Sequence, residues 1–334
     1  MRHACNCAGY LNLQTGTQQC KHCCLVCTAT EAPRIELNDG NKIPVVALGT
    51  GRGTANGVNN TEVRDAVFWA IEAGYRHIDT ASVYGDEPEV GQGIADAVAK
   101  GLVRREDLFV TTKLWNDKHA REQVVPSLRE SLALLGLDYV DLYLVHFPVA
   151  LKEDRTPDVI DYLETWRGMV EAHHLGLAKS IGVSNFNSTQ LERIIANSDV
   201  KPAVNQIEVN PTLTQEPLVS LCQKHGVAVM AYSPFGFLVS RSRADAPPPR
   251  YDDPGLTEIA EKYGKTTGQV VLRYLIDRGL VPIPKSTNKA RIAQNIDLFD
   301  FKLTADEIAT ISNYNKNVRV IAIDAWKNYP NYPF

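Results

Sequence analysis

The sequence predicts an α/β protein: a (β/α)8 barrel with an N-terminal β-hairpin and long loops at the carboxyl ends of its strands. Short apolar runs alternate with amphipathic segments eight times, a pattern typical of parallel strands joined by helices. No change in composition divides the chain after residue 33, and a single barrel of this kind commonly takes ~250 residues or more. Ionisable residues stand at the ends of successive apolar runs, where such barrels keep their active sites.

The strand and helix segments follow from periodicity and length. The predicted strands are residues 45–49, 75–79, 108–113, 140–146, 179–183, 203–208, 227–231 and 281–284. The predicted helices are residues 61–73, 87–99, 119–135, 160–175, 188–197, 215–225, 255–278 and 288–296. Eight regular units favour a closed barrel over its rival, an open doubly wound sheet.

Three further segments lie outside this alternation. Residues 34–44 read as a hairpin around an Asn-Asp-Gly-Asn turn. Residues 236–254, rich in Pro and Arg, predict a long mobile loop beside the active site. The tail after Asn313 is aromatic, and it either caps the bottom of the barrel or forms a pocket wall at the top. Its aromatic residues are Trp326, Tyr329, Tyr332 and Phe334.

Cysteine is concentrated at the N-terminus, because six of the seven cysteines lie in the first 27 residues. We expect residues 1–33 to be a disordered leader, or sequence upstream of the true start, and residues 34–334 to form one domain. Metal binding or lipid attachment by the leader is the alternative, but its Cys-x-x-Cys units are too compressed for a predicted metal site. The body contains only Cys222, which suits a reducing cytosol.

Charge and hydropathy exclude two classes of partner. The net charge is −4 and the basic residues are scattered, which argues against nucleic-acid binding. No apolar run approaches the ~20 residues that cross a bilayer. The sequence therefore predicts a cytoplasmic protein that acts on a small molecule.

The segment from Gly49 to Thr54 superficially resembles a dinucleotide-binding loop. The third glycine of that motif would stand at position 54, which is Thr, and no helix begins directly afterwards. We therefore reject a Rossmann interpretation. The glycines instead allow the backbone to approach a ligand closely.

Four residues at strand ends indicate carbonyl chemistry: Asp79, Tyr84, Lys113 and His146. Reduction of a carbonyl places negative charge on oxygen, so a proton donor must stand there. Tyr84 can be this acid, because a cation such as Lys113 lowers the pKa of a phenol. Asp79 would keep Lys113 charged, and His146 would orient the carbonyl. The alternative is a structural ion pair beside a packed aromatic ring.

From about residue 34 to its end, the chain resembles the aldo-keto reductases. The resemblance excludes the leader and rests on several motifs that occur in family order and at family spacing. These are residues 74–81 with Tyr84 and Glu87, 112–115, 137–148, 181–186, 205–208, 231–234, and 283–287 with Arg291 and Asn295.

The resemblance implies a nicotinamide dinucleotide extended across the top of the barrel. Tyr232 would stack on the nicotinamide ring, while Ser184, Asn185 and Gln206 would bind its carboxamide. Lys285, Ser286 and Arg291 fit a 2′-phosphate, which predicts NADPH as the cofactor. The family's cofactor positions fall on Gly49, Thr50, Gly51, Asp79, Ser184, Asn185, Gln206, Tyr232, Ser233, Phe235, Lys285, Ser286, Thr287, Arg291, Gln294 and Asn295.

Some positions depart from the family pattern. Gly51 and Phe147 stand where many members have Trp, which implies a roomier pocket. Asp86 replaces a common Asn, and Gln294 replaces a Glu that contacts adenine in many members. Expected substrate contacts are Trp115, His146 and Phe147. Further aromatics that either line this pocket or belong to the core or a cap are Phe237, Trp326 and Tyr329.

We therefore expect a monomeric NADPH-dependent reductase of aldehydes or ketones. Its first-strand loop and roomy pocket are similar to those of insect-type members that reduce steroid-like ketones such as 3-dehydroecdysone. General aldehyde detoxification is the rival activity. A non-catalytic lens-type or channel-associated protein is a third possibility, which the intact set of four residues argues against. A tethering role of the leader is a fourth.

Overall fold

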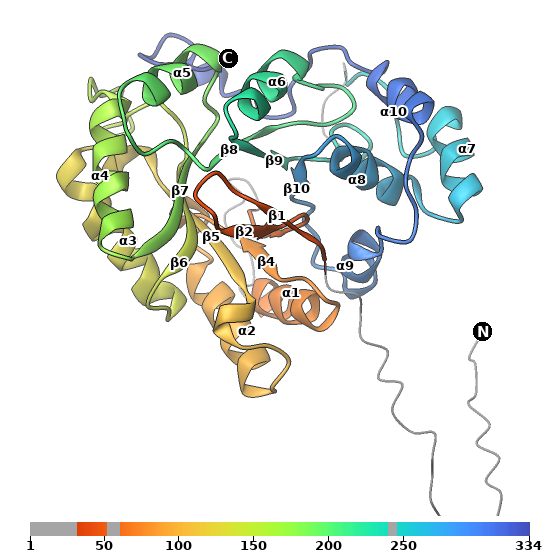
Figure 1. The fold of residues 1–334 in the computed structure, drawn as a ribbon, viewed down its shortest axis with the longest axis horizontal. Helices are drawn as coiled ribbons and strands as arrows, with labels where there is room; N and C mark the ends of the chain where they lie inside the picture. The colour runs from red at the N-terminus through yellow and green to blue at the C-terminus, as the bar shows by residue number, and fades with distance from the viewer. Residues whose placement is uncertain (1–31, 52–60, 240–245) are drawn as a thin grey trace, which may run out of the picture.

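The computed structural model describes residues 32–51, 61–239 and 246–334. The predicted leader, apart from Ala32 and Pro33, and residues 240–245 of the predicted loop lie outside the described residues. Eight strands form a central sheet, and helices surround it on the outside (Figure 1). Within the described part of the chain, no helix is long and apolar enough to cross a membrane.

The eight strands of the sheet each overlap one of the predicted runs. They are β3 (Leu48–Gly49), β4 (His77–Asp79), β5 (Phe109–Leu114), β6 (Val140–Val145), β7 (Ala178–Ser184), β8 (Val204–Glu208), β9 (Ala228–Tyr232) and β10 (Val281–Pro282). They pair in parallel and in sequence order. The first and last strands also meet, because Ala47 N donates to Pro282 O at 3.1 Å and Gly49 N donates to Pro284 O at 3.0 Å. The barrel is therefore closed, and the open-sheet alternative is wrong.

Helices follow the strands as predicted, with two differences. They are α1 (Thr61–Glu72), α2 (Glu87–Ala99), α3 (Arg121–Leu135), α4 (Tyr162–His174), α5 (Ser188–Ala196), α6 (Glu216–Lys224), α7 (Pro254–Tyr263), α8 (Thr267–Asp277), α9 (Lys289–Ile296) and α10 (Ala305–Ser312). The single helix predicted over 255–278 is wrong, because Gly264 adopts φ 63° and Thr266 starts α8 with a capping box. Helix α10 was not predicted, although Thr304 and Glu307 form a capping box at its start.

The N-terminal hairpin is confirmed and covers the amino ends of the barrel strands (Figure 1). Strands β1 (Arg34–Glu36) and β2 (Lys42–Pro44) pair antiparallel, with Ile35 opposite Ile43. Gly40 supplies the positive φ of 86° that the turn requires. The hairpin buries Leu37 and Ile43 against the first residues of several strands, so it seals the end of the barrel opposite the site.

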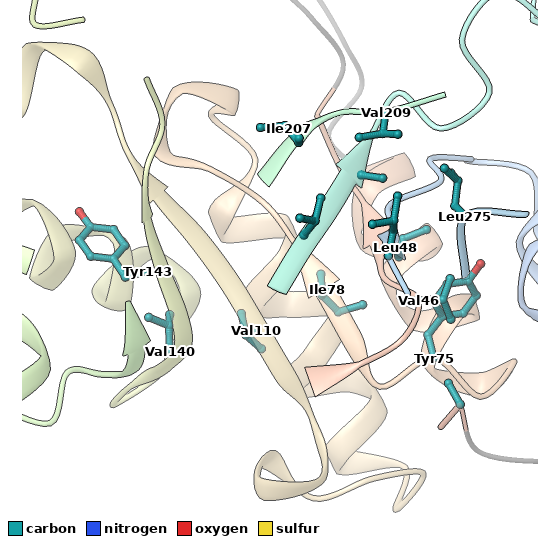
Figure 2. Close-up of a cluster of buried hydrophobic side chains, with 14 of the residues drawn as sticks. Val46, Leu48, Tyr75, Ile78, Val110, Val140, Tyr143, Ile207, Val209 and Leu275 are labelled. Carbon is teal, nitrogen blue, oxygen red and sulfur yellow. The ribbon is translucent and has the colours of Figure 1, made fainter. Parts of the chain in front are cut away.

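Alternation along the strands divides the core into an inner and an outer layer. In β5, Phe109 belongs to the cluster inside the barrel and Val110 to the cluster between the barrel and its helices. Figure 2 shows part of the outer cluster, where Leu48 of β3 and Ile78 of β4 lie in the same cluster as Leu275 of α8. Successive side chains of a strand point to opposite faces, so Lys113, four residues after Phe109, also points into the barrel. Because it stands near the carboxyl end of β5, it lies at the mouth of the barrel.

Helices α2 and α3 pack closely at Gly91, which provides a test of the packing. A Cβ added there would lie 2.3 Å from the backbone oxygen of Leu135, whereas one added at Gly268 of α8 would come no closer than 3.5 Å to Phe235. We predict that Gly91→Ala lowers the free energy of unfolding by about 1–3 kcal/mol, since the two backbones must separate. Gly268→Ala should be neutral or stabilising by up to ~1 kcal/mol. Equal stabilities in chemical denaturation would contradict this packing.

Candidate active site

The four predicted catalytic residues meet at the carboxyl ends of three neighbouring strands. Asp79 ends β4, Lys113 is the penultimate residue of β5, and His146 directly follows β6. Tyr84 ends a short 3-10 helix, η1 (Ser82–Tyr84), which follows β4. The barrel therefore brings together residues that are up to 67 positions apart, from 79 to 146.

The Lys113 ammonium is fully buried and ion-paired with Asp79. Its Nζ lies 2.7 Å from Asp79 Oδ1 and 2.9 Å from the carbonyl oxygen of Thr80. Gln206 Nε2 donates to the other Asp79 oxygen at 2.8 Å. Burial alone would lower the pKa of Lys113, but the charge of Asp79 and the hydrogen bonds with Asp79 and Tyr84 outweigh it and raise this pKa. The ammonium is thus held charged.

Tyr84 lies between this cation and the imidazole. The Lys113 Nζ is 5.2 Å from the centre of the Tyr84 ring, and the ring meets His146 edge-on with centroids 5.7 Å apart. Burial raises the pKa of Tyr84, while the charge of Lys113 and its hydrogen bond to Tyr84 counteract that rise. Lys113 thus acts on the pKa of Tyr84 in the predicted direction, but burial has the larger effect and the pKa is raised overall. Tyr84 stays protonated, as a proton donor must.

His146 is a neutral imidazole at the wall of the mouth. Burial and the nearby Lys113 charge hold its pKa well below 6.5. Its backbone is fixed from both sides, since His146 N donates to Leu114 O at 3.1 Å and its carbonyl accepts from Asn185 Nδ2 at 2.9 Å. A neutral imidazole carries one N–H, which it can donate to a carbonyl oxygen.

Buried amides and hydroxyls gather beside the four residues, as predicted for the carboxamide. Ser184 Oγ donates to Gln206 O at 2.8 Å, and Asn185 Nδ2 lies 3.2 Å from Ser184 Oγ. The hydroxyl of Tyr232 donates to Asn185 Oδ1 at 2.7 Å. Asn185 adopts φ 63°, a conformation that turns the chain out of β7. These polar groups from β7, β8 and β9 form one connected network.

Gly49, Thr50 and Gly51 are the described part of the glycine segment, whose residues 52–54 lie outside the described residues, and they stand at the end of β3. Gly51 stands against the Tyr84 ring: a Cβ added there would lie 2.8 Å from Tyr84 Cζ. Thr50 N donates to the carbonyl of Asp79 at 3.0 Å. After β9, Ser233 adopts φ 47°, and Phe235 packs near the start of α8.

The residues predicted for the 2′-phosphate lie together, in a group separate from the catalytic four. Lys285 and Ser286 follow β10, and Arg291 stands in the first turn of α9. Lys285 and Arg291 are exposed, whereas Ser286 is buried and its Oγ accepts from Asn288 N at 3.1 Å. The remaining members of the group are partly or fully exposed. They are Thr287, Gln294 and Asn295.

The aromatic tail lies over the top of the barrel. The ring centroid of Trp326 lies 6.0 Å from that of Trp115 and 5.3 Å from that of Phe147. The ring centroids of Phe334 and Phe147 are 6.5 Å apart. Of the two placements considered from sequence, the pocket wall agrees with these contacts. Phe237 is only 2% exposed, so it belongs to the packed interior.

The sequence analysis did not identify what holds this tail in place. Glu208 at the end of β8 is fully buried and accepts hydrogen bonds from Val320 N at 2.6 Å and Ile321 N at 2.9 Å. The motif containing Glu208 was recognised, but a carboxylate at a strand end does not reveal which distant backbone it binds. The carbonyl of Thr80, which binds Lys113, was missed too because a backbone acceptor has no sequence signal.

The fold and the site together define a class of enzyme. A closed (β/α)8 barrel with a protonated phenol, a buried ammonium and a neutral imidazole at its mouth can protonate a carbonyl oxygen as charge develops there. A model of the aldo/keto reductase family matches residues 45–316. The chain therefore belongs to the aldo/keto reductase family and is an oxidoreductase.

Individual relatives agree with this assignment. Aldo-keto reductase AKR2E4 of Bombyx mori is 71% identical over 306 residues, which cover 91% of this chain and 99% of the relative. Aldo-keto reductase family 1 member A1 of Gallus gallus is 41% identical, covering 90% and 97%. A crystal structure of the Bombyx mori AKR2E4 in complex with NADP gives a TM-score of 0.90 at 70% identity, with 91% and 99% coverage. A structure of AKR2E5 complexed with NADPH gives 0.89 at 46% identity, with 91% and 94% coverage.

The role of the Lys113–Asp79 ion pair in catalysis can be tested by neutralising Asp79 and, as a control, a second buried carboxylate outside the site. Asp79→Asn should lower kcat/KM for carbonyl reduction by about 100-fold or more, because Lys113 loses its counter-charge. Asp141, which pairs with Arg105 at 2.8 Å near the start of β6, provides the control. Asp141→Asn should leave the rate of the folded protein within about 2-fold, since the site is distant. Equal losses in steady-state assays of the two variants would contradict the assignment.

Proposed function

We propose that this chain is an NADPH-dependent carbonyl reductase that converts aldehydes or ketones to alcohols. The observation that carries the proposal is the position of Tyr84 beside a buried ion pair. In this pair Lys113 Nζ lies 2.7 Å from Asp79 Oδ1, and burial keeps the phenol of Tyr84 protonated. A buried charged pair is costly unless it is compensated, and placed beside a phenol its cation stabilises the phenolate that proton donation leaves.

The residues beside this pair fit a nicotinamide. Asn185 and Gln206 are buried amides whose partners come from β4, β6 and β9, so they offer fixed polar atoms to a carboxamide. Tyr232 is partly exposed at the end of β9 and offers a ring face for stacking. The two crystallised relatives are described with NADP and with NADPH, which supports the same cofactor here.

The chemistry follows from the protonation states of the side chains. The cofactor supplies a hydride to the carbonyl carbon when it is bound. Tyr84 donates its proton to the carbonyl oxygen as negative charge develops there, and Lys113 stabilises the phenolate that remains. His146 donates its single N–H to the same oxygen and thereby fixes the direction from which the carbonyl approaches. Asp79 keeps Lys113 in place throughout.

The substrate that we propose is a bulky apolar ketone of the steroid type, such as 3-dehydroecdysone. Trp115, Phe147 and Trp326 form a continuous aromatic wall beside His146, with ring centroids 5.2–6.4 Å apart along it. A wide apolar wall favours a large hydrophobic ligand. The 71% identity to an insect member supports the same branch of the family. General detoxification of aldehydes is the second candidate.

The molecule that we propose is a cytosolic monomer with a single domain over residues 34–334. The family model begins only at residue 45, which agrees with a leader outside the catalytic domain. Full-length protein and residues 34–334 should therefore have equal kcat. Unequal rates, or zinc bound to the full-length protein alone, would instead favour a functional leader.

The decisive test of the function is oxidation of NADPH by the full chain with steroid ketones and with small aldehydes, together with Tyr84→Phe. The kcat of the variant should fall by about 100- to 10,000-fold, because it lacks the hydroxyl that donates the proton. Its affinity for NADPH, measured by fluorescence titration, should be unchanged. Binding without turnover in the unmodified protein would favour a non-catalytic role, and faster reduction of small aldehydes would favour detoxification.

The preference for NADPH should reside in two cations. Lys285→Ala and Arg291→Ala should each weaken NADPH binding by about 10- to 100-fold and leave NADH binding unchanged, because each removes a charged partner of the 2′-phosphate. Lys289 lies in the same segment but pairs with Glu72 at 2.6 Å, so Lys289→Ala is the matched control. An equal effect of all three variants would indicate general electrostatic attraction and would contradict a specific site.

A further inference from the structure

Asp86 occupies the N-cap of α2 but does not cap it. Aspartate at this position normally accepts hydrogen bonds from the first N–H groups of the helix. Asp86 makes no such side-chain bond, and the residue is only 6% exposed. Its carboxylate instead accepts a hydrogen bond from Thr80, which directly follows the catalytic Asp79. A buried carboxylate that does not bind the free N–H groups of its own helix must be stabilised by other groups.

The contacts of Asp86 lead to Lys113. Asp86 Oδ1 accepts from Thr80 Oγ1 at 2.7 Å, and the Thr50 hydroxyl is a second partner of the same carboxylate. The carbonyl of Thr80 in turn accepts from Lys113 Nζ at 2.9 Å. Asp86 is therefore joined to the catalytic ammonium through one residue and to the end of β3 through another.

Charged and titratable groups from several elements lie near this carboxylate, and Thr50 after β3 contributes only a hydroxyl. Strand β5 supplies Lys113 and β4 supplies Asp79, while Tyr84 precedes the helix and Glu87 and Glu89 belong to it. Burial raises the pKa of Asp86, and the bonds from Thr80 and Thr50 and the charge of Lys113 oppose that rise. The two hydroxyl donors thus stabilise the ionised form of a buried acid.

A second negative charge beside Lys113 has a definite consequence for Tyr84. It stabilises the ammonium and disfavours the phenolate, so the phenol retains its proton to higher pH. We propose that Asp86 is a positioning residue whose buried carboxylate, hydrogen-bonded to Thr80 and through it linked to Lys113, disfavours the phenolate of Tyr84 and thereby shifts the alkaline edge of carbonyl reduction to higher pH. This role rests on the proposed function, because it concerns Tyr84 as proton donor.

The first test is the pH profile of kcat/KM for reduction of 4-nitrobenzaldehyde with NADPH. Asp86→Asn removes the charge but retains an oxygen that can accept from Thr80. The alkaline limb of the variant should move to lower pH by about 0.5–1 unit. Asp65→Asn, at an exposed position of α1, is the control with the same charge change and should not move the limb.

Two results would overturn the role of Asp86. One is an unmoved limb, and the other is an equal loss of rate at every pH together with a lower melting temperature, which indicates a structural residue only. If Asp86→Asn does not fold, Asp86→Ser removes the same charge with a smaller side chain and carries the same expectation.

The second test does not depend on catalysis. The tyrosinate absorbance of the protein minus that of Tyr84→Phe gives the titration of Tyr84, and the same difference is measured in the Asp86→Asn background. Tyr84 should ionise at lower pH when Asp86 is neutral, and equal midpoints would overturn the proposal. If the unmodified protein reduces no carbonyl, the proposed function fails while this titration still decides the role of Asp86.

Discussion

The buried ion pair between Lys113 and Asp79 is the interaction on which the rest of the site depends. Removing two charges from water costs several kcal/mol per ion unless other hydrogen bonds compensate. Here the compensation comes from the Thr80 carbonyl at 2.9 Å and the Gln206 amide at 2.8 Å. These partners lie on different parts of the barrel, so the pair is stable only when the barrel is closed. The pair and its hydrogen-bond partners therefore come together only in the folded barrel.

The same pair fixes the protonation of its neighbours in a way that suits proton donation. Burial lowers the pKa of His146, and the charge of Lys113 lowers it further, so that imidazole stays neutral. The charge of Lys113 also limits the rise that burial imposes on the pKa of Tyr84, so the phenol remains an acid that can still release its proton. Asp86 opposes Lys113 in this balance. Burial, two carboxylates and one ammonium together determine the pH at which the Tyr84 hydroxyl ionises.

Much of this organisation could be predicted from sequence, because strand periodicity and strand-end residues are local signals. The barrel, the hairpin and the clustering of Asp79, Lys113 and His146 follow from them. The break at Gly264 was missed because the apolar spacing continues across it. The direction in which Lys113 acts on the pKa of Tyr84 could be predicted, but the larger effect of burial has no local signal in the sequence. The hydrogen bonds that Glu208 accepts from the backbone N–H groups of residues 320 and 321 join segments far apart in the chain, so no local pattern predicts them.

The most direct test of the central claim is the pH dependence of carbonyl reduction by Lys113→Met, a substitution that keeps the length of the side chain but removes its charge. If Lys113 makes Tyr84 a usable acid, kcat should fall by about 100-fold or more, and the alkaline limb should move to higher pH or vanish. NADPH affinity should remain near that of the parent. A variant that keeps its rate and its pH profile would show that Tyr84 does not depend on Lys113, and the account of the site would be wrong.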